Sequence, residues 1–584
     1  MNNTLLDTIV DHLSRIYPEQ DIRSIAEKAI ETMGLSHSES PSTLHKNKWS
    51  EKDAWVITYG DSIKQQGQAP LKTLKSFTDK YLKGSISGLH ILPFFPYSSD
   101  EGFSVINYSQ VNDGLGGWED IEAIGNEYDL MSDLVINHCS QQSRWFENFR
   151  QRKDPGKDYF FEAEPSNDTS AVVRPRTSPL LRETRTLDGQ RHVWCTFSHD
   201  QVDLNFKNPD VFIEMVLIIR RYLEQGVKIF RLDAVAFLWK ELGTPCVHLP
   251  QTHEFIRLFR TLIEAHSEDA IIITETNVPL HENLSYLGNA NEAHAVYNFS
   301  LPPLLIHALI SGTSEHLKRW QMSMPPAQNG TFYFNFIASH DGVGLRPING
   351  LLDQQEIDTL INTMQNFGAR VSWRSVANGQ NEPYEINVSL YDALQGTTKG
   401  QDRWQLDRFI CAHAIMFALE GIPGIYIHSM LGTQNDHARL ELTNHNRNIN
   451  RHKWSLEELE TKLSSPNSHH RLVLDAITKL LKLRTQQPAF HPNAVQYTLH
   501  LGDSVFGFWR QSTDRQQSIF CIHNLSDEEV QIPISSINLI STQEWSDLVT
   551  GNTLDEQSDK LNLQPYQFVW LSNKSINNYG LCLN

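Results

Sequence analysis

Acidic residues end three apolar stretches of this 584-residue chain. The stretch Val227–Asp233 contains Arg231 two residues before its final Asp233, so a strand conformation would place both side chains on one face. Glu275 ends a second apolar stretch, and Asp341 follows a third. A carboxylate at the end of a buried strand costs free energy unless it is paired or used in chemistry. The three acids are therefore the candidate reactive residues.

Cleavage of a glycosidic bond is a reaction that these acids could perform, since it needs a carboxylate nucleophile and a carboxylic acid that donates a proton. Asp233 fits the nucleophile, because the nearby Arg231 would favour its ionised form. Glu275 fits the acid/base, because apolar strand neighbours tend to raise a carboxyl pKa. Asp341 could bind sugar hydroxyls as the ring flattens. The alternative for each acid is a structural role, such as capping a helix or pairing with an arginine.

Eight apolar runs that alternate with helical patterns would position these side chains. The runs cover residues 55–59, 88–93, 129–136, 227–233, 270–275, 294–298, 332–338 and 424–427. This alternation predicts an α/β fold, a closed parallel (β/α)8 TIM barrel, whose active site lies at the carboxyl ends of the strands. An open doubly wound sheet is the alternative, but the turn after the first run lacks a glycine-rich phosphate-binding sequence. His138 and His340 also follow apolar runs, and we expect them to donate hydrogen bonds as neutral side chains.

Helix signals are clearest directly before the run that ends in Asp233. Asn208 is a suitable N-cap, Pro209 suits the first helical position, and Gly226 stops the pattern. The sequence therefore predicts a helix from about residue 208 to residue 224 that leads straight into the strand of the candidate nucleophile.

Long connections and changes of pattern divide the chain further. Residues 139–204 follow the third run and residues 342–395 follow the seventh, and insertions at these strand ends usually build the site. Residues 1–50 show helical periodicity, with a predicted linker at 36–43, and would form a packing element or part of a subunit contact. Short β-rich runs predict an antiparallel β domain at 489–584. The barrel would then consist of residues 51–138, 205–341 and 396–488.

Composition excludes several classes of protein. The net charge of −19 argues against nucleic acid as a partner, and no apolar run approaches the roughly 18 residues that a membrane-spanning helix needs. The chain opens without a basic leader and apolar segment, so no secretory signal is expected. Its six cysteines are scattered, with no C-x-x-C pair, which favours reduced thiols over disulfides or a zinc site. Together these features predict a cytoplasmic protein without membrane contact.

Four short segments of the predicted barrel resemble the α-amylase superfamily of retaining glycosidases. They are residues 133–138 (D-L-V-I-N-H), Arg231-Leu232-Asp233, Glu275 and His340-Asp341, in the same order along the chain. The resemblance implies that Asp233 is the nucleophile, Glu275 the acid/base and Asp341 the transition-state stabiliser. It also implies a reaction that requires no metal and no organic cofactor.

Within that superfamily the chain is similar to the sucrose phosphorylase group, whose members use phosphate instead of water to release glucose. The similarity rests on residues 100–103 (D-E-G-F), Arg174-Pro175-Arg176, Phe197 with Gln201, Tyr384 with Asn387, and residues 447–451 (R-N-I-N-R). It implies that the glucosyl unit is held by Asp100, Phe103, His138, Phe197, Gln201, Arg231, His340 and Arg447. It implies that phosphate or the acceptor contacts Arg176, Tyr384, Glu385 and Asn387. A homodimer is the expected oligomeric state of this group.

The acceptor loop departs from that of the sucrose enzymes, which carry an acid and a glutamine around the tyrosine. Residues 382–387 (E-P-Y-E-I-N), the N-terminal extension, and residues 240–244 (K-E-L-G-T) with His248 and His253 look more like glucosylglycerate phosphorylases. The resemblance predicts cleavage of 2-O-α-glucosylglycerate by phosphate through a β-glucosyl-enzyme, giving α-glucose 1-phosphate and D-glycerate. Arg346 or Arg174 could pair with the glycerate carboxylate. The alternatives are a sucrose or glucosylglycerol phosphorylase, a hydrolase or transglucosidase, and a non-catalytic sugar-binding protein.

Overall fold

The computed structural model describes residues 4–35, 45–375, 381–537, 539–540, 543–555 and 558–574. The predicted linker at 36–43 lies outside these residues, as do Cys582 and the end of the predicted C-terminal domain. The five described cysteines are free and buried. Within the described ranges, every helix is too short or too polar to span a bilayer.

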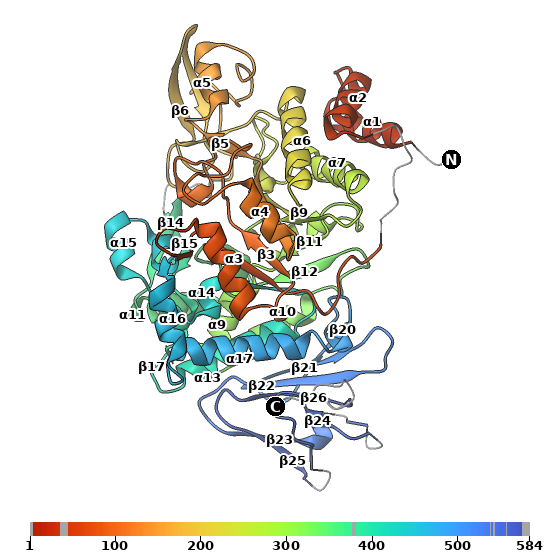
Figure 1. Ribbon diagram of the computed structural model, residues 1–584, viewed down its shortest axis with the longest axis vertical. Coiled ribbons are helices and arrows are strands. Elements are labelled where there is room, and N and C mark those ends of the chain that lie inside the picture. The colour runs from red at the N-terminus through yellow and green to blue at the C-terminus, as the bar shows by residue number, and fades with distance from the viewer. Residues whose placement is uncertain are drawn as a thin grey trace.

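Eight parallel strands close into a barrel near the middle of the molecule (Figure 1). In spatial order they are β1 (Trp55–Thr58), β3 (Gly88–Ile91), β4 (Asp129–Val135), β9 (Val227–Asp233), β10 (Ile271–Thr274), β11 (Ala295–Tyr297), β12 (Phe332–Asn335) and β18 (Ile422–Tyr426), which pairs with β1 again. Each of the eight predicted runs contributes one strand, so the predicted barrel is confirmed. The strands are apolar throughout because helices cover the outside of the barrel and side chains fill its interior.

Helices between the barrel strands and after the last one surround the barrel. They include α3 (Pro70–Tyr81), α4 (Trp118–Gly125), α6 (Pro209–Glu224), α7 (Pro250–His266), α8 (Leu280–Leu284), α9 (Leu301–Ser311), α10 (Glu315–Ser323), α13 (Gln405–Ala418), α14 (Ile427–Met430), α15 (His437–Thr443), α16 (Leu456–Ser464) and α17 (His469–Arg484). Helix α6 begins as predicted, because the Asn208 side chain accepts a hydrogen bond from the Asp210 N–H at 3.0 Å. It leads directly into β9 and thereby fixes the position of Asp233.

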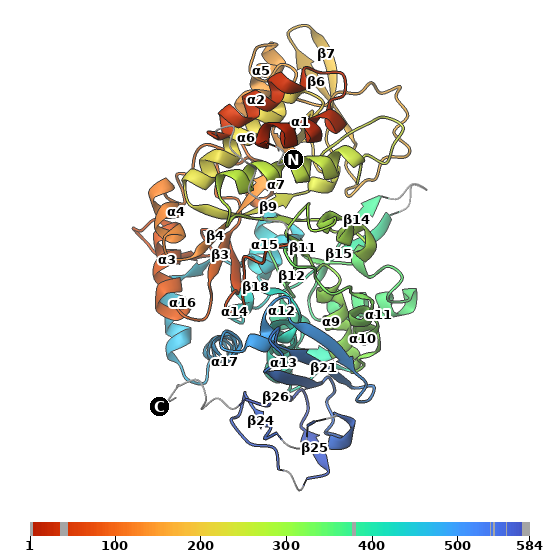
Figure 2. The same cartoon turned by 90° about the vertical axis from the view of Figure 1, so that its right-hand side faces the viewer.

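The N-terminal helices α1 (Leu5–Ile16) and α2 (Ile22–Met33) pack on the barrel of their own chain (Figure 2). Helix α1 contacts α7 and helix α2 contacts α6. The Tyr17 hydroxyl donates to the Phe206 carbonyl at 2.7 Å, and Arg15 pairs with Glu254 at 2.8 Å. This extension therefore packs on the two helices that precede β9 and β10.

Two insertions rise from the carboxyl ends of the strands. After β4 come β5 (His138–Ser140), α5 (Arg144–Gln151), the hairpin of β6 (Leu181–Thr186) and β7 (Gly189–Trp194), and β8 (Gln201–Asp203), which pairs with β5. After β12 come β13 (Val343–Gly344), α11 (Gln354–Asn366), β14 (Arg370–Ser375), β15 (Asn381–Asn387) and α12 (Leu390–Ala393). Strands β13, β15 and β14 form a small antiparallel sheet. The predicted insertions after the third and seventh barrel strands are thus present.

An antiparallel β domain closes the chain, as predicted. Its main sheet has the order β20 (Val495–Leu499), β21 (Val505–Gln511), β22 (Ser518–Asn524), β26 (Phe568–Ser572) and β24 (Ser546–Asp547), and β23 (Val530–Pro533) pairs with β25 (Lys560–Leu563). Two further short pairs lie in the barrel region, β2 (Ile63–Lys64) with β19 (Trp454–Ser455) and β16 (Gly396–Thr397) with β17 (Gly400–Gln401). The β domain lies at the opposite end of the molecule from the insertion after β4 (Figure 1).

Candidate active site

Two connected cavities open at the carboxyl ends of the barrel strands. The inner cavity, of about 70 Å³, is lined by Asp100, Phe103, His138, Arg176, Phe197, Gln201, Arg231, Asp233, Ala234, Glu275, Asn277, His340, Asp341, Tyr384 and Arg447. The outer cavity, of about 480 Å³, shares six of these residues: Asp100, Arg176, Phe197, Gln201, Tyr384 and Arg447. Of the fifteen residues the sequence predicts, thirteen thus line the inner cavity. Glu385 lines the outer cavity, and Asn387 lines neither.

Arg231 joins the two acids that are predicted to react. Its Nη1 donates to Asp233 Oδ1 at 2.9 Å, and its Nη2 lies 3.8 Å from Glu275 Oε1. The same Nη1 also donates to Asp133, whose other oxygen accepts from His90 Nε2 at 2.7 Å. Arg231 is only 2% exposed, so this buried cation lies between three carboxylates. It fixes Asp233 toward the inner cavity.

The backbone after Asp233 positions Glu275. Ala234 has a left-handed conformation, with φ of 51°, which is unfavourable for a residue that is not glycine. In this conformation its N–H donates to Glu275 Oε2 at 3.1 Å. Glu275, the acid/base candidate, is therefore held next to Ala234, which directly follows Asp233.

Burial dominates the protonation of the two reacting acids. It raises the pKa of Asp233 well above its ordinary value, and Arg231 opposes this rise without offsetting it. Arg231 favours the ionised form of Asp233, as expected, but burial and the negative charges of Glu275 and Asp133 outweigh the arginine, so the pKa is raised overall. Burial also raises the pKa of Glu275. The two acids thus bind a proton at higher pH than isolated carboxyl groups, which suits a site that needs one acid and one carboxylate.

Asp341 has the opposite electrostatic environment. Its Oδ1 lies 2.5 Å from Arg447 Nη1, and Arg447 also donates to both oxygens of Glu385, at 3.0 Å and 2.8 Å. Burial raises the pKa of Asp341, but Arg447, His340 and Arg231 outweigh burial, and the pKa falls below its ordinary value. Asp341 is therefore ionised in the free site and carries negative charge close to the place where positive charge develops on a cleaved sugar.

Neutral donors and an aromatic ring form the wall of the inner cavity. The rings of Phe103 and His340 stack with centroids 5.1 Å apart. His138 Nε2 donates to the Phe103 carbonyl at 2.9 Å, and Gln201 Nε2 donates to Asp100 Oδ2 at 3.2 Å. Burial lowers the pKa of both histidines, which are therefore uncharged at neutral pH. Such a wall suits a neutral, polyhydroxylated ring.

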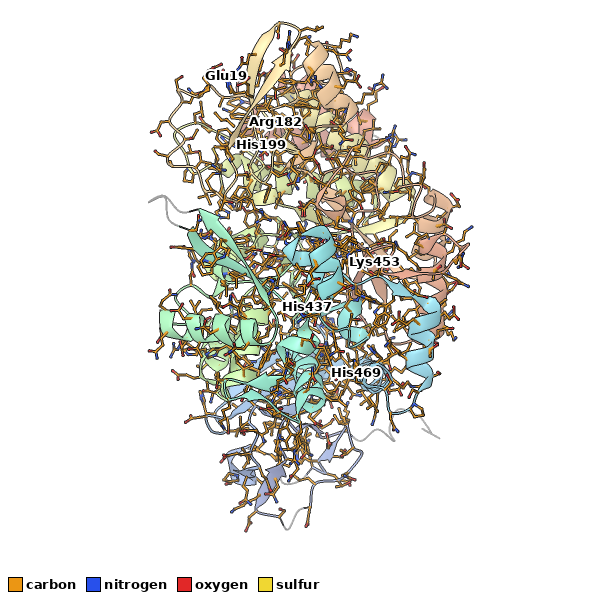
Figure 3. The ribbon with its side chains drawn as sticks, turned by 90° about the vertical axis from the view of Figure 1, so that its left-hand side faces the viewer. Glu19, Arg182, His199, His437, Lys453 and His469 are labelled. Carbon is orange, nitrogen blue, oxygen red and sulfur yellow. The ribbon has the colours of Figure 1, made fainter. Side chains whose placement is uncertain are left out.

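Arg176 forms the boundary between the two cavities. Its guanidinium lies 5.7 Å from the ring centre of Phe197 and 5.4 Å from that of Tyr384, and no carboxylate pairs with it in the described chain. Burial raises the pKa of the Tyr384 hydroxyl, which thus remains a hydrogen-bond donor. The two long insertions supply these residues, Arg176 from the segment after β4 and Tyr384 from β15. Figure 3 shows the insertion after β4, marked by Arg182 and His199, above His437 at the start of α15 (His437–Thr443).

Three residues proposed for anion or acceptor contacts are placed elsewhere. Asn387 lies in β15, and its amide donates to Ser372 Oγ at 2.9 Å. Arg346 points to Glu282, with 3.6 Å between Nη2 and Oε2, and lines neither cavity. The Arg174 guanidinium donates to the Ser178 carbonyl and also lines neither cavity. Each of these side chains contacts a neighbour outside the two cavities, so the sequence position of a residue in an insertion does not decide which way it points.

Several lining residues were not predicted. Asn277 lines the inner cavity, and its buried Oδ1 accepts no hydrogen bond from the described protein. It follows Glu275 by two residues, a spacing that could have indicated it. The outer cavity is also lined by Ser99, Thr177, Ser178, Ser198, Ser372, Trp373, Asn444, His445 and Asn446. Most of these come from loops, where no periodic pattern predicts direction.

Comparison with known proteins agrees with this geometry. Residues 59–346 match the family model described as the catalytic domain of α-amylase. The chain is 41% identical over 528 residues to the glucosylglycerate phosphorylase of Spirochaeta thermophila, a match that covers 89% of this chain and 90% of that protein. It is 39% identical to the glucosylglycerate phosphorylase of Escherichia coli, and this match covers 96% of this chain and 99% of that protein.

Solved structures give the same result for the fold. The crystal structure of sucrose 6F-phosphate phosphorylase from Thermoanaerobacter thermosaccharolyticum has a TM-score of 0.70 at 26% identity and covers 81% of this chain and 94% of its own. The α-amylase of H. orenii has a TM-score of 0.62 at 18% identity, and the match covers 90% of this chain and 100% of that α-amylase. The barrel, the acids at its strand ends and these relatives together show that the chain belongs to the α-amylase family, in the group that includes the glucosylglycerate phosphorylases.

Proposed function

We propose that the protein is a retaining glycoside phosphorylase that cleaves 2-O-α-glucosylglycerate with phosphate to α-glucose 1-phosphate and D-glycerate. The observation that carries this proposal is that a pair of acids and an anion-binding position lie next to each other in one site. Asp233 and Glu275 share the cation Arg231, and an arginine without an acidic partner, Arg176, lies directly outside them with Tyr384. The relatives named glucosylglycerate phosphorylase, at 39–41% identity over most of the chain, support the choice of substrate.

The first step transfers glucose to the protein. Asp233 Oδ attacks the anomeric carbon of the α-glucoside, while the proton on Glu275 moves to the leaving oxygen of glycerate. The Arg231 guanidinium stabilises the carboxylate of Asp233 before attack, and ionised Asp341 stabilises the positive charge that develops on the ring. The product of this step is a β-glucosyl ester on Asp233 and free glycerate.

The second step uses phosphate as the nucleophile. A phosphate oxygen attacks the anomeric carbon from the α face, the bond to Asp233 breaks, and Glu275, now ionised, accepts the proton that the phosphate loses. Arg176 and the Tyr384 hydroxyl supply charge and a donor for the other phosphate oxygens. Two inversions give α-glucose 1-phosphate.

The same arginine would receive the glycerate carboxylate in the reverse reaction. Three arginines line the cavities, and Arg231 and Arg447 are each paired with acids, whereas Arg176 has no acidic partner in the described chain. Because glycerate leaves before phosphate enters, one cation can serve both anions in turn. We therefore propose Arg176, in place of Arg346 or Arg174, as the residue that pairs with the acceptor carboxylate.

The remaining features of the proposal follow from the same groups. The protein side chains supply the nucleophile, the acid and the charges, so we propose that no metal or organic cofactor takes part and that phosphate is a co-substrate. Full activity after treatment with EDTA would support this. Free cysteines and a phosphate co-substrate are consistent with a cytoplasmic enzyme. The proposed homodimer can be checked by size-exclusion chromatography with light scattering.

A panel of donors tests the substrate. Purified protein and phosphate are incubated separately with glucosylglycerate, glucosylglycerol, sucrose and sucrose 6'-phosphate, and glucose 1-phosphate is measured. We expect the highest kcat/KM with glucosylglycerate, because Arg176 then has an anionic partner in both half-reactions. A higher value for sucrose or glucosylglycerol would assign the protein to that alternative, and free glucose alone would indicate a hydrolase.

A further inference from the structure

The turn that carries Asp100 has a strained backbone. Asp100, Glu101 and Gly102 have successive φ values of 54°, 50° and 115°. Glycine adopts such values readily, whereas the left-handed region is unfavourable for Asp and Glu. A Cβ at position 102 would lie 2.7 Å from the Pro93 carbonyl oxygen, so the turn also fits tightly against the end of β3. Two adjacent non-glycine residues keep this conformation only if their surroundings hold it.

One side of the turn is held by the insertion after β4. Gln201 donates to Asp100 Oδ2 at 3.2 Å, and Ser99 donates to Asp200. Glu101 reaches in another direction, where its Oε1 accepts from Arg439 Nη2 at 3.0 Å. Both side chains of this ion pair are 23% exposed. The pair therefore connects the strained turn to helix α15.

Helix α15 and the segment that carries Arg447 form one hydrogen-bonded unit. The Asp436 N–H donates to the Ile449 carbonyl at 2.8 Å, and Asn448 donates to Thr443 Oγ1 at 2.9 Å. Asp436 also caps the helix by accepting from the Arg439 N–H at 2.9 Å. Figure 3 marks the start of this helix by His437. Because Arg447 lies within the unit, Arg439 ties the turn of Asp100 to the segment that carries a second cavity-lining residue.

We propose that the Glu101–Arg439 ion pair is a clamp that holds the strained turn in its active conformation before substrate binds. Asp100 and Arg447 both line the inner and outer cavities, so the clamp positions two side chains that face the glucosyl unit. The proposal rests on the proposed function only in that these two residues contact glucose. Arg439 lines neither cavity and is a positioning residue.

A clamp of this kind has a distinct kinetic signature. Without it, part of the binding free energy is used to form the turn, whereas the bound complex is unchanged. We expect Arg439→Gln to raise the KM for α-glucose 1-phosphate about tenfold. The strain energy typical of a left-handed non-glycine residue corresponds to a change in affinity of about this size. We expect kcat to change by less than about threefold. Arg439→Lys keeps the charge and should recover part of the loss.

Substitutions at Glu101 separate the ion pair from the strain. Glu101→Ala and Glu101→Gly both remove the carboxylate, but glycine tolerates the left-handed conformation. We expect the KM for Glu101→Gly to lie at least about threefold below that for Glu101→Ala. The double variant Glu101→Gln/Arg439→Gln should have a KM no higher than that of either single variant, because each substitution removes the same ion pair. Arg319→Gln on α10, which breaks an exposed ion pair with Glu315 far from the cavities, is the matched control and should leave the kinetics unchanged.

The readouts distinguish failure of the clamp from failure of the proposed function. Hydrolysis of α-glucose 1-phosphate and binding of D-glucose by titration calorimetry do not depend on the acceptor, so both remain informative if the protein does not use glucosylglycerate. Equal KM values for Glu101→Ala and Glu101→Gly would overturn the proposal. A lowered melting temperature with unchanged KM and glucose affinity would also overturn it, as would additive losses in the double variant.

Discussion

The inner and outer cavities of the site are built from different parts of the chain. The inner cavity is made mainly by residues at the ends of barrel strands, and apart from Arg176 at its boundary its arginines are paired with acids, with Arg231 between Asp133, Asp233 and Glu275. The outer cavity is made mainly by the two long insertions, together with residues 99–100 and 444–447, and its residues include Trp373, which is 52% exposed. We therefore propose that the barrel supplies the groups for bond cleavage, whereas the insertions select the molecule that accepts the glucosyl unit.

The two cavities also differ in how their arginines are paired with acids. Arg231 lines only the inner cavity, and its ion pairs with Asp133 and Asp233 hold the reactive carboxylate in place. Arg176, at the boundary, contacts two aromatic rings and has no acidic partner in the described chain. A cation that lacks an internal counter-ion is available for an anion from solution. This contrast leads to separable effects of mutation.

The largest effect is expected in the inner cavity. Asp233→Asn removes the nucleophile and should lower kcat for phosphorolysis by about 10⁵-fold or more, because no other group can form the glucosyl ester. Release of glucose 1-phosphate from glucosylglycerate measures this. Asp210→Asn, an exposed change on α6, is the control. Residual activity above about 1% of the original would show that another residue is the nucleophile.

Glu275→Gln should lower kcat with glucosylglycerate by about 10³-fold, since the leaving oxygen then receives no proton. With α-glucosyl fluoride, whose leaving group needs no proton, the loss should be only about tenfold for the first step. Comparison of initial rates on the two donors measures the difference. Equal losses on both would mean that Glu275 has a role other than proton transfer.

Arg176→Gln should separate the two cavities. Phosphorolysis is expected to fall about 10²-fold, as for loss of one charged donor, while glucosylation of Asp233 by α-glucosyl fluoride stays within about threefold. The product should shift from glucose 1-phosphate to glucose, which chromatography measures. Arg174→Gln, whose guanidinium lies outside both cavities, is the matched control. An equal loss of glucosylation would place Arg176 in the inner chemistry and contradict the division.

The pH profile reports the inner acids alone. Burial raises the pKa of Glu275, so its protonated form persists to higher pH, and kcat/KM falls as pH rises through this raised value, about tenfold per pH unit beyond it. Burial also raises the pKa of Asp233, so the fall of kcat/KM at acid pH should occur at a pH above the ordinary pKa range of an aspartate. The alkaline limb should vanish with α-glucosyl fluoride as donor. Its persistence there would assign the limb to another group.

The smallest effect is expected at Arg346, which points to Glu282 and lines neither cavity. Arg346→Ala should change the preference for glycerate over glycerol, measured in the synthetic direction with glucose 1-phosphate, by less than about threefold. A larger change would return this residue to the acceptor site.

The same division explains what could be predicted from the sequence. The eight barrel strands follow from apolar runs, and the Asn208 cap follows from local hydrogen-bonding chemistry, so Asp233 and Glu275 could be placed at one end of the barrel. The directions of Asn387, Arg346 and Arg174 could not, because they depend on tertiary neighbours within the insertions. The sign of the Asp233 pKa shift also depends on burial, which neighbouring residues in sequence do not reveal.

Some of the missed features had weak signals. Asp133 opens the segment 133–138, and its pairing with Arg231 follows from the register of β4 and β9 once the barrel is closed. The bidentate contact of Glu385 with Arg447 joins residues 62 positions apart, and neither segment has a pattern that points to the other.

Nuclear magnetic resonance of the products of a single reaction tests the central claim most directly. Purified protein is mixed with 2-O-α-glucosylglycerate and phosphate, and the ¹H and ³¹P spectra are followed from the first turnovers. Double displacement at Asp233 with capture by phosphate in the outer cavity predicts α-glucose 1-phosphate and glycerate in equal amounts. Initial formation of β-glucose 1-phosphate, or of glucose without a phosphate ester, would contradict it.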